Sequence, residues 1–584
     1  MRRVKRHWLA LLVLGLVGLL YGITATRYVQ GGDNGEFATL FAEGGIAHPS
    51  GYPLYTLWLR GFCWLPAVTP AHGAALATAL LAWCANGLLY AAMLAWGAHP
   101  VPAALALTLY ALAREPWLLA TSAEVFALNQ LVAAAAVLLS GAESPLRGPS
   151  RATALALLGG LVASTHWSGV LLAPCYAIGL CRAAKESSWR ATVLRLPLGL
   201  LGLLPFFYLP WVAHAPGDRW VWGNFGTVAG MVDHVLRREY GTFTLSPSGH
   251  GLDPVPYLLD LGRRLTAELW GAPLVVLVLL GYFVWRRQWQ RLSAIWPLLA
   301  AFVLAGPCFV SLFNIPLSGP GPALVARFHV LPAMLLVVLL SVLLPPVTER
   351  LAALVGGGAL TVLLGLSMLI NFDAVLQLNG PNVERYLVDS LESLPKGAVL
   401  FGKNDMRLFG LLYLQRARAV RPDVVHIAPA LLMRAWYRAR ISRALSMAIR
   451  PPLDHQTYNG PGLVDDLQTE GRTVFVMDTD DTMLPIILSR PSYPLGTLVR
   501  LLRPGEIEPA LDELLRMNDA WFQAHPPPAA PPLPEARWER VARWDYVRTL
   551  RYLAGELSKQ GQTAKAFELR RFAQGIVGEA LPDD

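Results

Sequence analysis

Charged residues are scarce in this chain. Asp, Glu, Lys and Arg make up 15% of its 584 residues, hydrophobic residues make up 54%, and the mean hydropathy is +0.42. Soluble globular domains usually contain about 25% charged residues. This composition therefore excludes an ordinary soluble enzyme of this length and predicts an integral membrane protein.

Charge is absent from several long stretches. The first runs from His7 to Thr26 and follows a basic N-terminus. It is long enough to cross a bilayer, and no small-residue cleavage site follows it, so we expect a retained transmembrane helix and not a signal peptide. Similar stretches continue to Asp373, and dividing the longest at Pro, Gly and His predicts roughly eleven spans.

The short basic loops predict the orientation of these spans. In an eleven-span arrangement they all fall on one side, which the positive-inside rule assigns to the cytoplasm. These loops are the N-terminus, Arg147 with Arg151, Arg182 to Arg195, residues 285–291, and Arg350. Loops 27–71 and 214–271, and the chain after Asp373, are then expected outside. Because these anchors supply most of the net charge of +9, that charge does not indicate nucleic-acid binding.

Cysteine is also rare. The five cysteines lie in or near the apolar part of the chain: Cys63, Cys84, Cys175, Cys181 and Cys308. The part expected outside therefore has no disulfide framework. Arginine greatly outnumbers lysine, and alanine and proline are abundant, which indicates a bacterium with a GC-rich genome. We expect a bacterial inner-membrane protein with a cytoplasmic N-terminus and a periplasmic C-terminal part.

The chain changes character near Asn371. Residues 1–372 read as the transmembrane domain, whereas 373–524 contain short apolar strands at 397–401, 423–427 and 472–477, with amphipathic helices between them. This pattern predicts a small external α/β domain. A proline-rich spacer is expected at 525–534. Residues 535–584 then read as a helical hairpin that resembles one tetratricopeptide unit, too little for a solenoid, so we expect it to dock on the α/β domain or on a partner.

Two carboxylates and a histidine directly follow the first apolar segment. Asp33-Asn34-Gly35-Glu36-Phe37 has two acids three residues apart, and the next block, residues 45–53, contains His48. Acids at this spacing share one face of a helix, and the flanking glycines allow the backbone to approach a ligand closely. A carboxylate at a membrane edge is costly unless it is functional or paired. The alternative is a helix cap, with Asp33 at the N-cap and Glu36 at the third helical position.

The blocks around Asp33 and His48, together with five others further along the chain, resemble the signature of a membrane glycosyltransferase family of the GT-C superfamily. The family includes the eukaryotic transmembrane protein O-mannosyltransferase that modifies plexin-type immunoglobulin-like domains, and bacterial relatives without assigned substrates. The resemblance covers about residues 8 to 440. The blocks that carry it are 33–37, 47–54, 123–129, 164–166, 216–218, 237–243 and 326–332. Ser50 stands where family members often have Pro, and the tetratricopeptide array of the eukaryotic relative is reduced to one hairpin, which leaves the acceptor open.

The resemblance implies a fold and an activity. The expected fold is a polytopic α-helical membrane protein of the GT-C type with a C-terminal external α/β domain and a terminal helical hairpin. The expected reaction is the inverting transfer of a hexose, with mannose as first choice, from a polyprenyl-phosphate donor to Ser or Thr of a secreted or periplasmic protein. No cofactor is expected besides the lipid-linked sugar, which is the donor substrate, and metal dependence stays open because the carboxylates of Asp33 and Glu36 could serve without any ion. Loops 27–71 and 214–271 are expected to form the catalytic cavity, with the C-terminal domain covering it or recruiting acceptor.

Such a transfer needs a base for the acceptor hydroxyl and cations for the departing phosphate. Asp33 is the candidate base, and Glu36 orients it or contacts the sugar. Arg327 and Arg238 are the leaving-group candidates, because arginine presents a bidentate fork to phosphate. The remaining donor-binding candidates are His48, Glu124, Asn129, His166, Asp218, Tyr240 and His329.

Six of these candidates have a plainer interpretation. Arg327 could be an interfacial anchor, and Arg238 could belong to a solvated helix face paired with Glu239. His166 could be a hydrogen-bonded core histidine and His48 a cap of its loop. Glu124 and Asn129, about one helical turn apart, could join two spans.

The segment Asp478-Thr479-Asp480-Asp481 resembles the metal motif of nucleotide-sugar transferases. Its expected external location argues against metal binding, because nucleotide sugars belong to the cytoplasm, so we predict no metal site. Two other classes stay open: a GT-C transferase acting on an envelope lipid or glycan, and a transporter or flippase. A transporter is expected to show a two-fold repeat of spans, which this sequence lacks.

Overall fold

The computed structural model describes residues 2–241, 253–346, 356–450, 460–477, 487–528 and 537–578. The chain forms two compact units. The helical unit comprises residues 1–27 and 40–379, and the α/β unit comprises residues 28–39 and 380–584. Helix α2 (Asn34–Glu43) contributes its first turns to the α/β unit and its last residues to the helical unit.

The helical unit has the composition of a membrane bundle. In the described part of the chain, seven helices are long and apolar enough to cross a membrane, and the pair α13 and α14, bent by 96°, raises this to eight if it is one span. The predicted multi-pass membrane class is confirmed at this level. The predicted count of roughly eleven includes shorter apolar helices such as α5 and α7, and it stays a prediction.

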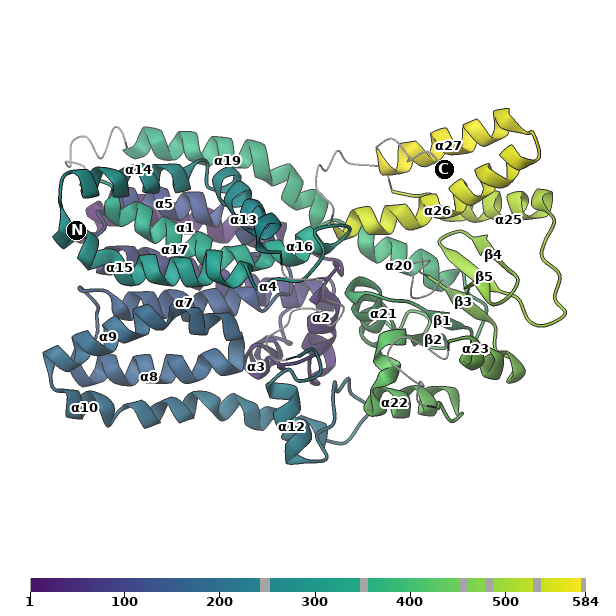
Figure 1. The fold of residues 1–584 in the computed structure, drawn as a ribbon, viewed down its shortest axis with the longest axis horizontal. Coiled ribbons are helices and arrows are strands. Elements are labelled where there is room, and N and C mark those ends of the chain that lie inside the picture. The colour runs from purple at the N-terminus through teal and green to yellow at the C-terminus, as the bar shows by residue number, and fades with distance from the viewer. Residues whose placement is uncertain are drawn as a thin grey trace. The chain divides into compact units, whose positions relative to one another are not determined.

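The elements of the helical unit are labelled in Figure 1. Besides the end of α2, they are α1 (Arg2–Thr24), α3 (Pro53–Gly61), α4 (Pro70–Ala95), α5 (Pro100–Ala111), α6 (Arg114–Ala120), α7 (Phe126–Ser140), α8 (Gly148–Thr165), η1 (Trp167–Leu172), α9 (Ala173–Glu186), α10 (Trp189–Val193), η2 (Leu196–Phe207), α11 (Tyr208–Ala213), α12 (Val228–Val235), α13 (Pro254–Glu268), α14 (Ala272–Trp285), α15 (Trp289–Val303), η3 (Leu304–Cys308), α16 (Gly321–Ala326), η4 (Arg327–His329), α17 (Val330–Leu343) and α19 (Gly357–Leu378).

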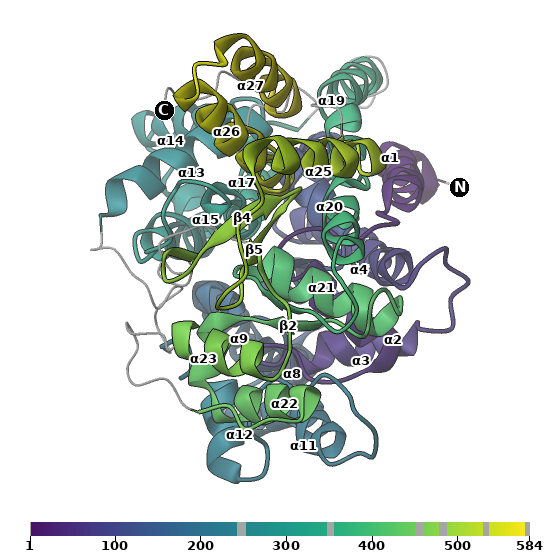
Figure 2. The ribbon, with the colours of Figure 1, turned by 90° about the vertical axis from the view of Figure 1, so that its right-hand side faces the viewer.

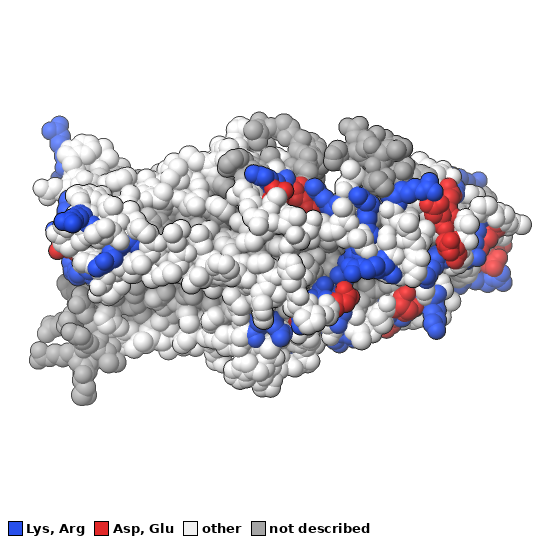
Figure 3. All heavy atoms as spheres, turned by 90° about the horizontal axis from the view of Figure 1, so that it is seen from below, with Lys and Arg blue, Asp and Glu red and all other residues white. Residues whose placement is uncertain are grey.

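Basic turns gather at one end of the helical unit. The N-terminus, the α9–α10 turn and the α14–α15 turn lie together there (Figure 1), and Figure 3 shows blue side chains at this end beside a largely white flank. Arg147 and Arg151 both lie 3.3 Å from the carboxylate of Glu186, so the α7–α8 turn belongs to the same end. The loops that the sequence assigns to one side are thus neighbours, except Arg350, which lies outside the described residues. Their cytoplasmic orientation stays a prediction.

The α/β unit is built on one mixed sheet with the strand order β2-β1-β3-β5-β4. The strands are β1 (Val399–Phe401), β2 (Val425–Ile427), β3 (Val474–Val476), β4 (Ser492–Leu495) and β5 (Leu498–Leu501). Strand β1 lies between β2 and β3 and pairs in parallel with both, with Val399 opposite Val425 and Val474. Short apolar runs of this kind are typical of parallel strands buried on both faces. Strands β3, β5 and β4 pair antiparallel.

Helices surround this sheet (Figure 2). They are α20 (Asn382–Glu392), α21 (Asp405–Ala417), η6 (Pro429–Met433), α22 (Ala435–Leu445), α23 (Gly460–Thr469), α25 (Leu511–Ala524), α26 (Trp538–Lys559) and α27 (Thr563–Val577). The hairpin of α26 and α27 turns at Gly561, whose φ of 77° suits glycine. Helix α26 packs on α20 and β4, and the Tyr546 hydroxyl donates to Asp389 of α20 over 2.6 Å. Within its unit the hairpin is therefore docked on the α/β layer.

Candidate active site

His166 lies where helix α8 gives way to η1. Its Nδ1 lies 2.7 Å from the Ser168 hydroxyl and accepts the Ser168 backbone N–H. Asn129 of α7 donates its side-chain N–H to the same hydroxyl over 3.0 Å. Ser168 thus connects two residues that the sequence singles out separately. It completes a polar group of one imidazole, one hydroxyl and one amide.

Aromatic rings enclose this polar group. Tyr52 stacks on His166 with ring centroids 6.2 Å apart and 10° between the planes. Phe126 and Phe328 lie 5.0 Å and 6.0 Å from the same imidazole. Rings from the first loop, from the start of α7 and from η4 therefore surround one side chain. Such apolar walls with a few convergent polar groups are typical of a ligand site.

Arg327 joins this group through Phe126. Its guanidinium carbon lies 5.7 Å from the Phe126 ring centre, and its Nη1 lies 3.5 Å from the Glu124 carboxylate. The two charged side chains are 14% and 6% exposed. An interfacial anchor holds its charged head in water, so this burial favours a role inside the protein. A planar guanidinium at such a place can bind phosphate with two parallel hydrogen bonds.

The first loop is fastened to the second large loop within the helical unit. Ile46 donates to the Trp220 carbonyl over 2.8 Å and accepts from the Trp222 backbone N–H over 3.1 Å. Gly45 makes this approach possible, because a Cβ there would lie 2.2 Å from the Trp220 oxygen. His48 follows, with its ring 5.2 Å from Tyr52 and 6.2 Å from Trp222. His48 therefore continues the row of rings that begins at His166.

His234 of α12 is a histidine that sequence reasoning missed. It is 4% exposed and lies against Gly51 and Gly223. Burial, with a smaller contribution from His48, lowers the pKa of His234 to about 3, so its imidazole is neutral at physiological pH. Sequence reasoning also missed three neighbours of predicted residues. Ser168 lies two residues after His166, Phe328 lies one residue after Arg327, and Tyr52 lies four residues after His48.

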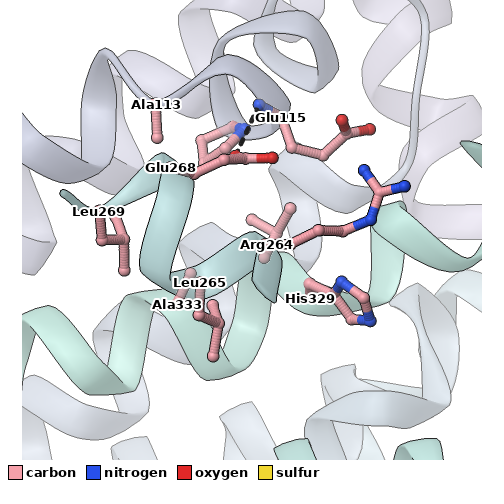
Figure 4. Close-up of a pocket in the computed structure, with 10 residues that line it drawn as sticks. Ala113, Glu115, Arg264, Leu265, Glu268, Leu269, His329 and Ala333 are labelled. Carbon is pink, nitrogen blue, oxygen red and sulfur yellow. Dashed lines mark hydrogen bonds between the residues drawn. The ribbon is translucent and has the colours of Figure 1, made fainter. Parts of the chain in front are cut away.

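Four predicted donor-binding residues lie apart from this group. His329 lines a cavity together with Glu115, Arg264 and Glu268 (Figure 4). Arg238 forms an exposed ion pair with Asp233 at 2.7 Å, while Glu239, its expected partner, accepts from Trp222 Nε1 over 3.0 Å.

The other two residues belong to the second loop. Tyr240 lies under Arg237, with 5.8 Å from the guanidinium carbon to the ring centre, and Asp218 is exposed. The structure therefore brings together His48, Glu124, Asn129, His166 and Arg327, and it does not add these four to them.

The acidic motif lies in the α/β unit, at the start of α2. The Phe37 backbone N–H donates to the Asp33 carbonyl over 3.1 Å, which places Asp33 at the N-cap and Glu36 at the third helical position. Asp33 is partly exposed and Glu36 is buried. This is the backbone arrangement of the capping alternative. A carboxylate has about four lone-pair positions, so capping and proton abstraction are compatible for Asp33.

No group of three or more His, Cys, Asp or Glu residues in the described ranges is arranged to hold a metal ion. The Asp478 to Asp481 segment lies outside the described residues. The prediction of no metal site therefore stays a prediction.

Residues 33–189 match the family described as the N-terminal domain of protein O-mannosyl-transferase TMEM260. The chain is 27% identical over 450 residues to protein O-mannosyl-transferase TMEM260 of Mus musculus, covering 74% of this chain and 64% of the mouse protein. It is 21% identical over 490 residues to the protein of the same name from Dictyostelium discoideum, covering 74% of this chain and 59% of that protein. The chain thus spans about three fifths of the length of these relatives. The predicted resemblance to this group of transferases is confirmed.

Two solved structures share the fold. They are ArnT from Cupriavidus metallidurans in the apo state, with a TM-score of 0.52, and the same protein bound to undecaprenyl phosphate, with a TM-score of 0.50. Each is 14% identical and covers 86% of this chain. At this identity the likeness concerns the fold alone. It confirms the mostly helical fold expected from the sequence for the membrane part of the chain.

Proposed function

We propose that this chain is an inverting membrane glycosyltransferase. It transfers a hexose, mannose in the first instance, from a polyprenyl-phosphate donor to a Ser or Thr hydroxyl of an exported protein at the outer face of a bacterial inner membrane. The likeness to proteins named O-mannosyl-transferases supports the sugar and the acceptor. The undecaprenyl phosphate bound to a protein of the same fold supports the lipid carrier.

The observation that carries the proposal is the largely buried Arg327 side chain beside Glu124 and the His166 group. This group lies at the end of the helical unit opposite the basic turns. Helix α7 begins at that end, at Phe126, and helix α8 ends there, at Thr165 (Figure 1). If the basic turns are cytoplasmic, this group faces outward, where lipid-linked sugars serve as donors. Arg327 offers the fixed positive charge that a departing lipid phosphate requires.

The reaction is a single displacement. The bond between the anomeric carbon of the sugar and the phosphate oxygen breaks, and its electron pair leaves with the lipid phosphate toward Arg327. The acceptor hydroxyl oxygen forms the new bond to the anomeric carbon from the opposite side, and its proton passes to the Asp33 carboxylate. A general base of this kind contributes about 10² to 10⁴ in rate. Glu36, buried one helical turn further on, orients Asp33.

The other residues of the site bind the donor sugar. Asn129, Ser168 and His166 offer hydrogen bonds from one compact group, and Tyr52 and Phe126 offer apolar faces beside it. Sugars commonly present both hydroxyls and an apolar ring face. Glu124 holds Arg327 in place through the 3.5 Å ion pair.

The direct test uses the purified protein with radiolabelled polyprenyl-phosphate mannose and a Ser/Thr-rich peptide. We expect label on the peptide that is released by alkaline β-elimination, with an anomeric configuration opposite to that of the donor. Label found only on envelope lipid or glycan would contradict the protein acceptor and support a transferase that acts on an envelope lipid or glycan. Movement of the lipid-linked sugar across a liposome bilayer without transfer would contradict the transferase and support a flippase.

A further inference from the structure

The segment that carries Asp33 is held by residues far away in the sequence. Residues 28–39 belong to the same compact unit as residues 380–584. The Val29 backbone N–H donates to the Glu384 carboxylate over 2.7 Å, and the Gln30 side chain donates to the Gly380 carbonyl over 3.0 Å. These two bonds tie the residues just before the acidic motif to the start of α20.

Close backbone packing holds the motif from its other sides. A Cβ at Gly35 would lie 2.4 Å from the Phe409 carbonyl oxygen in α21. A Cβ at Gly31 would lie 1.9 Å from the Trp538 ring at the start of α26. Because only glycine fits at these distances, the segment packs directly on two helices of the α/β unit.

Glu384 is the ionisable member of these contacts. Glu384 is 9% exposed. The carboxylate oxygen that does not bind Val29 accepts a hydrogen bond from the guanidinium of Arg418, at the end of α21, over 3.3 Å. One carboxylate thus joins α20, α21 and the segment before Asp33. A charge-assisted bond to a backbone N–H is among the stronger hydrogen bonds in proteins.

We infer that Glu384 is a positioning residue for the reaction: by fixing Val29, it sets the place of Asp33 four residues later. This inference rests on the proposed role of Asp33 as the base. The α/β unit then contributes to catalysis by holding the base as well as by any contact with acceptor. A misplacement of about 1 Å at a reacting group can cost about 10²-fold in rate.

The test compares Glu384→Ala with Glu506→Ala in the full-length protein. Glu506 makes the same kind of contacts elsewhere in the unit, accepting from the Arg503 backbone N–H over 3.1 Å and from Arg500 over 3.3 Å. Steady-state kinetics with the lipid-linked sugar give kcat and KM, a thermal melt gives Tm, and hydrogen exchange followed by mass spectrometry reports on a peptide that contains Val29.

For Glu384→Ala we expect kcat to fall about 10- to 100-fold with KM for the donor nearly unchanged, and faster exchange at Val29. Glu506→Ala, at a side chain that is 33% exposed against 12% for Glu384, should lower Tm by less and leave both kcat and the exchange at Val29 unchanged. Glu384→Gln, which retains an acceptor oxygen for Val29, should recover most of kcat. Unchanged exchange in Glu384→Ala, or an equal loss of kcat in Glu506→Ala, would overturn the inference.

Two further outcomes separate this inference from the proposed function. If the wild-type protein transfers no sugar, the proposed function fails, while the exchange at Val29 still tests whether Glu384 holds the segment. If Glu384→Ala does not fold, Glu384→Asp keeps the charge and shortens the side chain by one methylene. Wild-type kcat and exchange in a folded Glu384→Asp protein would then contradict the inference.

Discussion

Replacing Arg327 by lysine keeps a positive charge beside Glu124 but removes the planar fork that matches phosphate. Because the ion pair is largely buried, losing the charge altogether would remove the opposite charge beside the Glu124 carboxylate, and breaking a buried pair in this way costs about 3 to 5 kcal/mol. Arg327→Lys avoids most of that cost, so we expect a Tm close to wild type. The lost charge-assisted bond to the leaving phosphate is worth about 1.5 to 3 kcal/mol. That corresponds to a fall in kcat of about 10- to 150-fold.

The assay measures turnover of polyprenyl-phosphate mannose alongside the melt. Arg238→Ala is the matched comparison, because Arg238 forms an exposed pair with Asp233, with side chains 60% and 51% exposed, and such pairs contribute about 0 to 1 kcal/mol. We expect that variant to stay within about twofold of wild type in kcat. Wild-type turnover by Arg327→Lys would refute the leaving-group assignment, and His166 would become the first candidate.

Three more predictions follow from other parts of the chain. An alkaline phosphatase that is active only in the periplasm, fused after Asp584, should be active, since the basic turns are predicted to be cytoplasmic; activity of a cytoplasmic reporter at that point would contradict the orientation. The pKa of His234 is lowered to about 3 in the folded protein, whereas a histidine in the unfolded chain has a pKa of about 6.5. As the pH falls below about 6.5 the unfolded chain therefore binds this proton before the folded protein does, and the free energy of unfolding should decrease by about 2 kcal/mol by pH 5. His234→Gln should remove this part of the decline in Tm between pH 7.5 and 5, and an unchanged decline would refute it. Gly45→Ala should lower Tm and expression, because its Cβ would meet the Trp220 carbonyl and its φ of 125° is strained for alanine; a wild-type Tm would show that the two loops are not fastened there.

The parts of the fold that the sequence predicts are those that local composition determines. Charge-free runs follow from the absence of water in a bilayer, and they identify the membrane bundle. Apolar runs such as Val399 to Phe401 predict three short strands, and these runs correspond to β1, β2 and β3. Helix α26 (Trp538–Lys559) lies within residues 535–584, where the amphipathic pattern predicts a helical hairpin.

The strands at the edge of the sheet could not be predicted in the same way. Strand β4 contains Pro494, which lacks a backbone donor and argues against a strand in any sequence reading. It is tolerated because β4 is the last strand of the sheet, where no further neighbour needs that donor.

The contacts of the site depend on chain packing that no local pattern records. Glu124 and Arg327 are 203 residues apart, and Val29 and Glu384 are 355 residues apart. His329 lies in the 3₁₀ turn η4 and lines a cavity with Glu115 and Arg264, two residues that no local pattern places beside it.

The loop around Arg238 shows the same limit. The positive φ of 55° at Arg237 turns the chain back, so that the Arg238 backbone N–H reaches the Asp233 carbonyl over 2.9 Å and its side chain meets Asp233. The adjacent Glu239 is left to accept from Trp222. From the sequence alone, Glu239 is the expected partner of Arg238 because the two residues are adjacent. In the structure the backbone conformation brings Arg238 to Asp233.

Turnover by Asp33→Asn tests the central claim most directly. Asparagine is as good an N-cap as aspartate, so the start of α2 and the Tm should be preserved, but its amide cannot take a proton at neutral pH. With purified protein and a polyprenyl-phosphate sugar, we predict that kcat falls by about 10² or more while KM for the donor changes little, and that Glu36→Gln loses less. Full activity of Asp33→Asn would leave Asp33 with its capping role alone and contradict the account.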